Sequence, residues 1–218
     1  MSLTPSYDTF AAGFDAGENQ VVYARLAADL DTPVSLMMKL SDARKDSFML
    51  ESVTGGEVRG RYSIIGMKPD LIWQCHGKTS QINRSARYDR DNFEDCKSEP
   101  LAALREVIAE SHIELPDDLP AASAGLFGYL GYDMIRLVEH LPNVNTDVLQ
   151  LPDAVMIRPS VIAVLDGVKG DVIIVSPAWV KGGQSARAAY AQAAERVMDA
   201  VRDLERPAPQ SRDLGDLS

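Results

Sequence analysis

Apolar residues recur with two different periods along this chain, and the change between them predicts its elements. Spacings of three and four residues, which are typical of one face of a helix, predict helices at 7–16, 100–111 and 185–204. Gly17 follows the first helix as a C-cap, and Pro100 suits the first turn of the second. Gly17 therefore marks the end of the first helix, and Pro100 marks the start of the second.

Short runs rich in β-branched and aromatic residues predict strands between these helices. Polar residues, glycine and proline separate the runs, and this turn chemistry is typical of an antiparallel meander. Asp133 can cap a further helix from Met134 to about Leu141, which Pro142 would end. The expected strands span residues 21–23, 33–40, 47–53, 62–66, 71–75, 123–132, 155–165 and 171–176.

The segment 166–170, Asp-Gly-Val-Lys-Gly, is a strong hairpin signal. The runs on either side of it are almost continuously apolar, which predicts strands covered on both faces. Strands and helices do not alternate regularly, and this argues against a doubly wound sheet. The pattern therefore predicts an α+β fold of mainly antiparallel sheets packed together with covering helices.

Composition adds limits on location and partners. The chain has 218 residues, of which 45% are hydrophobic and 25% charged, so an ordinary globular core is expected. A net charge of −10 makes nucleic acid and anionic membranes poor partners, because acidic surfaces repel phosphates. Two cysteines cannot build a disulfide framework, so we expect a reducing, cytoplasmic location. No apolar run is long enough to span a bilayer.

The usual motifs of catalysis and of phosphate or metal binding are missing from the sequence. Gly125 and Gly128 lack the lysine and hydroxyl residue of a P-loop, and their spacing favours close backbone approach or a bulge. The three histidines are far apart, so a zinc site is unsupported. Cys75 lies in an apolar run, which favours a buried side chain over a nucleophile. The carboxylates are scattered over different elements, and nothing pairs them as acid and base.

A serine on an apolar strand face is the best candidate for a binding residue. Strict alternation in the run 47–53 places Phe48, Leu50 and Ser52 on one face. A buried hydroxyl needs a partner, which is either the backbone of a neighbouring strand or a ligand. Packing considerations alone favour the neighbouring strand.

Several segments resemble the N-terminal region of anthranilate synthase component I. Residues 49–52 read Met-Leu-Glu-Ser and residues 61–66 read Arg-Tyr-Ser-Ile-Ile-Gly, similar to the family's Leu-Leu-Glu-Ser…Ser element. Met49 stands where the family more often has leucine, a near-isosteric change. Further matching segments are Pro-Val-Ser at 33–35, Gly-Leu-Phe-Gly-Tyr-Leu-Gly-Tyr-Asp at 125–133 and Glu-His-Leu-Pro at 139–142.

The resemblance implies part of a carbon–oxygen lyase that converts chorismate and ammonia to anthranilate and pyruvate, using Mg²⁺, in tryptophan biosynthesis. A glutamine amidotransferase subunit, component II, would supply the ammonia. The family's chorismate and Mg²⁺ residues lie in a C-terminal catalytic half that would begin after a linker at 207–218. The resemblance therefore assigns no catalytic, metal or cofactor residue to this chain, and implies a regulatory domain at 1–206 that is inactive alone.

The site that the resemblance does assign is an allosteric site for tryptophan as inhibitor. Leu50, Glu51 and Ser52 would line this site, and Ser63 would support it from the neighbouring strand. An indole needs apolar walls and its amino-acid head needs a few polar groups, which this set can offer. Two alternatives stay open, namely the N-terminal part of aminodeoxychorismate synthase component I of the folate pathway and a non-catalytic docking protein.

Overall fold

The structure is a computed structural model that describes residues 2–41, 45–51, 60–142 and 147–207. The strands within these residues are β1 (Gln20–Ala27), β2 (Phe48–Leu50), β3 (Tyr62–His76), β4 (Thr79–Asn83), β5 (Glu94–Asp95), β6 (Phe127–Leu130), β7 (Ala154–Asp166) and β8 (Asp171–Ala178). These eight strands form one antiparallel sheet with the order β1-β8-β7-β3-β4-β5. Outside this order, β2 pairs with β3 and β6 pairs with β7.

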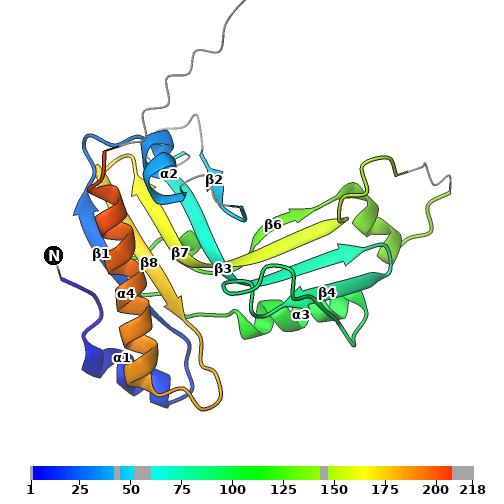
Figure 1. The fold of residues 1–218 in the computed structure, drawn as a ribbon, viewed down its shortest axis with the longest axis horizontal. Coiled ribbons are helices and arrows are strands. Elements are labelled where there is room, and N and C mark those ends of the chain that lie inside the picture. The colour runs from blue at the N-terminus through cyan, green and yellow to red at the C-terminus, as the bar shows by residue number, and fades with distance from the viewer. Residues whose placement is uncertain (1, 42–44, 52–59, 143–146, 208–218) are drawn as a thin grey trace, which may run out of the picture.

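The helices divide between the two halves of the sheet. They are α1 (Tyr7–Asp15), α2 (Pro33–Ser41), α3 (Pro100–Glu110) and α4 (Ala186–Leu204), with 3₁₀ helices η1 (Ala121–Ser123) and η2 (Tyr132–Leu137). Figure 1 shows β3 and β7 passing through a bend in the sheet, with α1, α2 and α4 at one half and α3 at the other. The α+β architecture with antiparallel strands and covering helices is thus confirmed, with the described strands in one curled sheet.

The two central strands near the hairpin are covered on both faces, as their apolar runs predict. One face of β7 and β8 carries Val161, Ala163 and Ile174, which pack in the core beneath α4. The other face carries Ile162 and Ile173, which pack in a separate core against the chain around 113–127. The hairpin at 166–170 joins these strands, and the helices expected at 7–16, 100–111 and 185–204 are all present.

The strand predicted at 33–40 is wrong, because these residues form the helix α2. Thr32 and Ser35 exchange hydrogen bonds, each backbone N–H donating to the other side chain's hydroxyl, at 2.9 and 3.1 Å. This reciprocal pattern begins a helix in the way a capping box does. Leu36 and Leu40, one helical turn apart, are then both buried.

The turn predicted between 66 and 71 is also wrong, because β3 continues through it. Pro69 lies directly opposite Pro159 of β7, and the strand register shifts between Pro69 and Leu71. Neither proline has an N–H to donate, so the ladder is interrupted there and a bulge replaces regular pairing. The hydroxyl of Ser160 donates to the carbonyl of Lys68 at 2.5 Å and compensates locally for the missing donors.

Strand pairing differs from a simple meander. The strands β3 and β4 form a sequential hairpin, but β1 pairs with β8 and the long β3 pairs with β7. The helix expected at 134–141 is the shorter 3₁₀ helix η2, and the strand expected at 123–132 is reduced to β6. The expected linker lies outside the described residues, apart from Pro207.

Candidate functional site

The predicted regulatory segment begins in β2, which pairs with the first half of β3. Phe48 lies opposite Gly66, Met49 opposite Ile65 and Leu50 opposite Ile64. Directly opposed residues in an antiparallel pair share a face. Phe48 and Leu50 therefore lie on one face of the sheet, whereas Met49 lies on the other and packs against the core beneath α4.

Gly66 makes the position of Phe48 possible. A Cβ atom built on Gly66 would lie 2.3 Å from the Phe48 ring, so any side chain there would displace the ring. The same ring stacks on Phe127 of β6, with 4.7 Å between the ring centroids. Two segments that carry the family resemblance, 61–66 and 125–133, thus meet at Phe48.

Of the predicted site residues, the structure places Leu50 and Ser63 on opposite faces of the sheet. Leu50 is 51% exposed at the end of β2, and Glu51, which follows it, is exposed. Ser63 is half-buried in β3 opposite Leu165 and shares a face with Ile65, which is not the face of Leu50. Ser52 lies outside the described residues. The tryptophan site itself therefore stays a prediction.

Arg61, which opens the second motif segment, anchors the start of β3 to the β7–β8 hairpin. Its Nε and Nη2 donate to the two carboxylate oxygens of Asp166 at 2.9 and 2.6 Å. The buried Asp166 carboxylate also accepts from the backbone N–H groups of Val168 and Lys169. The Arg61 guanidinium and these backbone donors lower the pKa of Asp166 from 3.8 to about 2.

This lowered pKa predicts a loss of stability in acid. Asp166 gains protons more readily when the chain is unfolded, so its stabilising effect is complete above about pH 4 and disappears as the pH falls towards 2. The pKa difference corresponds to roughly 2 kcal/mol of unfolding free energy. Urea unfolding from pH 6 to pH 2 should show this loss in the wild type and not in Asp166→Asn. The exposed Asp117→Asn should keep the wild-type slope, and parallel curves for all three proteins would contradict the assignment.

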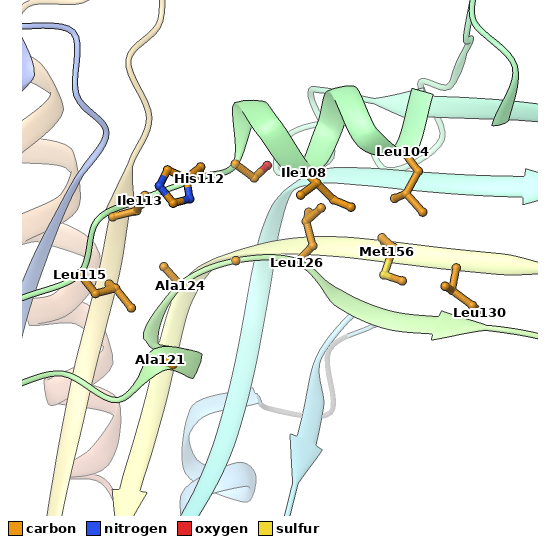
Figure 2. A pocket seen from close by; sticks show the side chains of 12 residues that line it. Leu104, Ile108, His112, Ile113, Leu115, Ala121, Ala124, Leu126, Leu130 and Met156 are labelled. Carbon is orange, nitrogen blue, oxygen red and sulfur yellow. The ribbon is translucent and has the colours of Figure 1, made fainter. Parts of the chain in front are cut away.

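An apolar cavity of about 460 Å³ lies in the bend of the sheet. Figure 2 shows Leu104 and Ile108 of α3 on one side of it, with Leu126 and Met156 facing them. Ser111 and His112 supply polar groups at one end, and none of Leu50, Glu51 and Ser63 lines the cavity. Sequence reasoning missed this cavity because its walls come from separate segments of the chain.

No group of three or more His, Cys, Asp or Glu side chains in the described part of the chain is placed to hold a metal ion. Cys75 is buried, as predicted, and burial raises the pKa of its thiol to about 11, so the thiol stays protonated. None of the described helices is long and apolar enough to cross a membrane.

Comparison with known proteins identifies relatives that match most of the chain. No family model matches it. It is 69% identical to anthranilate synthase component 1 of Cereibacter sphaeroides over 98% of its length, 34% identical to that of Pseudomonas aeruginosa over 86%, and 35% identical to that of Thermus thermophilus over 69%. The chain spans 43%, 37% and 30% of these relatives, which is less than half of each.

A solved structure supports the fold. Anthranilate synthase component I from Streptococcus pneumoniae matches 85% of this chain with a TM-score of 0.54 and 22% identity, and the chain covers 38% of that protein. The curled antiparallel sheet with its covering helices is thus a fold that this chain shares with part of that protein. The chain belongs to the family of anthranilate synthase component I and corresponds to the N-terminal region of its members.

Proposed function

We propose that this chain is the tryptophan-binding, feedback-regulatory part of a cytoplasmic anthranilate synthase component I. The observation that carries the proposal is the 69% identity over 98% of the chain to a protein of that name. The complete enzyme would convert chorismate and ammonia to anthranilate and pyruvate. Its remaining part would hold chorismate and Mg²⁺, and component II would supply ammonia from glutamine.

The position of β2 suits a regulatory element. It is short, and three residue pairs connect it to β3. Phe48 links it to β6, and Met49 links it to the core beneath α4. Tryptophan bound at Ser52, which is two residues after this strand in the sequence, would bias the position of β2 and hence of both neighbours. Inhibition then requires that tryptophan binds the inactive arrangement more tightly than the active one.

Exposed apolar side chains at this end of the sheet support contact with the rest of the enzyme. Leu50 on β2 is 51% exposed, and Val34 and Met38 on α2 are 52% and 42% exposed. Figure 1 shows α2 and β2 at the same end of the sheet. Val34 and Met38 lie one helical turn apart on α2 and are neighbours on the surface, and we propose that the C-terminal catalytic half covers them. Leu50 lies on the other face of the sheet from the core into which α2 packs, so it is a separate exposed apolar residue.

The proposal predicts that Ser52→Phe in the complete enzyme relieves inhibition by tryptophan. The larger ring would fill the space for the indole, and a coupling of 1–3 kcal/mol corresponds to about 5- to 150-fold in inhibitor concentration. Anthranilate formation is measured against tryptophan concentration and normalised to each variant's own uninhibited rate.

The matched control for this variant is Ser2→Phe, the same change at an exposed residue near the N-terminus. Its inhibition curve should overlay that of the wild type. Ser52→Phe with an unchanged inhibition curve would refute the tryptophan site, and failure of the wild-type complete enzyme to form anthranilate would refute the enzyme assignment.

A further inference from the structure

A basic pocket of about 480 Å³ lies where the bulge of β3, the chain after β4 and the start of α4 meet. Its lining carries the cations Arg84, Arg87, Lys181 and Arg196 and the single carboxylate Asp70. The whole chain has a net charge of −10, so a concentration of positive charge at one place runs against its composition. The pocket therefore needs an explanation in terms of what it binds.

The carboxylates near the pocket do not neutralise these cations. Asp70 accepts two hydrogen bonds from the buried Arg158, at 2.8 and 3.1 Å, and lies 3.5 Å from Lys181. Glu110 pairs with Arg84 at 2.6 Å. Counting Arg158, five cations thus face three carboxylates, the third being Glu195 beside Arg196, and this leaves an excess of positive charge at this place.

The remaining two cations of the pocket, Arg87 and Arg196, form no ion pair with a described residue. Arg87 is exposed and has no hydrogen bond or ion pair with any described residue. Nη1 of Arg196 donates to the carbonyl oxygen of Pro177 at 3.3 Å and to the hydroxyl of Ser176 at 3.5 Å, but its buried Nε has no acceptor in the described part of the chain. Burial and the neighbouring Arg87 lower the pKa of Arg196. Both effects disfavour its charged form, and a bound anion would relieve them.

The start of α4 adds to this positive potential. Gly183, Gln184 and the N-cap residue Ser185 line the pocket. The first backbone N–H groups of a helix have no partner within the helix, and the helix dipole places partial positive charge there. Such a terminus favours phosphate and other anions. Here the terminus and the two arginines that form no ion pair with a described residue face the same cavity.

We propose that this pocket binds a small phosphorylated metabolite, with its phosphate between Arg87, Arg196 and the start of α4. Guanidinium groups form strong charge-assisted hydrogen bonds with phosphate oxygens. The volume exceeds that of a free phosphate and falls within the range of small-molecule sites. The proposal is independent of the tryptophan site, because none of its lining residues belongs to β2 or to the motif at 61–66.

Calorimetric titration of the intact protein tests this proposal. Inorganic phosphate and glucose 6-phosphate are the two probes, and EDTA is present so that no divalent cation binds phosphate elsewhere. We expect saturable binding of glucose 6-phosphate that is tighter than that of inorganic phosphate. Arg87→Gln should weaken it at least tenfold, equivalent to about 1.4 kcal/mol, and Arg196→Gln should weaken it as well.

Arg105→Gln is the matched control, because Arg105 is exposed on α3 and does not line the pocket. It should leave the affinity unchanged, and thermal unfolding should confirm that all three variants fold. The proposal is overturned if neither phosphate compound binds, if Arg87→Gln and Arg105→Gln bind equally well, or if malonate binds as tightly as glucose 6-phosphate. That last outcome would assign the pocket to a carboxylate instead.

Discussion

Arg158→Ala should lower the free energy of unfolding by about 3–5 kcal/mol, the range for breaking a buried ion pair from one side. Arg158 is buried in β7 and donates from Nε and Nη2 to both oxygens of Asp70. Its Nη1 donates to the hydroxyl of Ser111 at 3.2 Å, and its guanidinium lies 4.4 Å from the centre of the Trp179 ring. Truncation removes all of these contacts and leaves the Asp70 carboxylate with Lys181 as its remaining cation.

The expected loss follows from where these partners lie. Ser111 ends α3 in one half of the sheet, and Trp179 follows β8 in the other. Asp70 lies in the bulge of β3 between them. Arg158 thus connects both halves at the bend, where the opposed prolines interrupt the ladder of backbone hydrogen bonds.

Urea unfolding of Arg158→Ala, Asp70→Ala and the double variant measures this contribution. The sum of the two single losses in unfolding free energy should exceed the loss in the double variant, because each truncation removes the same ion pair. Arg25→Ala is the control, since Arg25 makes longer ion pairs of 3.5 and 3.7 Å in a partly exposed place. Such pairs contribute at most about 1 kcal/mol, and a similar loss for Arg158→Ala would contradict its role at the bend.

Features with local signals could be predicted from the sequence. The three long helices have apolar stripes and clear ends, such as Pro100 at the start of α3 and Ser185 at the start of α4. The hairpin between β7 and β8 follows from turn residues that are contiguous in sequence. Antiparallel pairing and burial on both faces followed from the same short segments.

Features that depend on distant partners could not be predicted in this way. Pro69 looks like part of a turn until Pro159 is known to face it across the sheet. The helix α2 contains residues that also suit a strand, and the hydrogen bonds between Thr32 and Ser35 decide in favour of the helix. The pairing of β1 with β8 joins segments about 150 residues apart along the chain, and no local pattern encodes it.

The same distinction applies to the sites. The segments at 49–52 and 61–66 were recognisable because their residues are contiguous, and the structure pairs Met49 and Leu50 of the first with Ile65 and Ile64 of the second. The separation of Leu50 from Ser63 onto opposite faces could only be seen once the pairing register was known. The basic pocket near Arg196 was invisible to motif reasoning, because its cations come from three separate segments.

Gly128→Ala should lower the free energy of unfolding by roughly 3 kcal/mol, at the upper end for a substitution that forces a backbone shift. A Cβ atom on Gly128 would lie 1.8 Å from the carbonyl oxygen of Val155 and 3.0 Å from the Cα atom of Met156. Both are backbone atoms of β7, so no side-chain rotation can relieve the contact. β6 would have to move away from β7, and the stacking of Phe127 on Phe48 would weaken with it.

Gly182→Ala provides the matched control, because a Cβ atom there meets nothing within 4 Å and the backbone is not left-handed. This variant should change the unfolding free energy by less than about 0.5 kcal/mol. Urea unfolding compares the two, and amide hydrogen exchange at β2 and β6 reports whether both strands loosen together. Equal stabilities would mean that β6 moves away from β7 freely. Faster exchange in β6 without faster exchange in β2 would mean that the Phe48–Phe127 contact does not couple the two strands. Regulation through β2 would then have to act through Met49 and the core beneath α4.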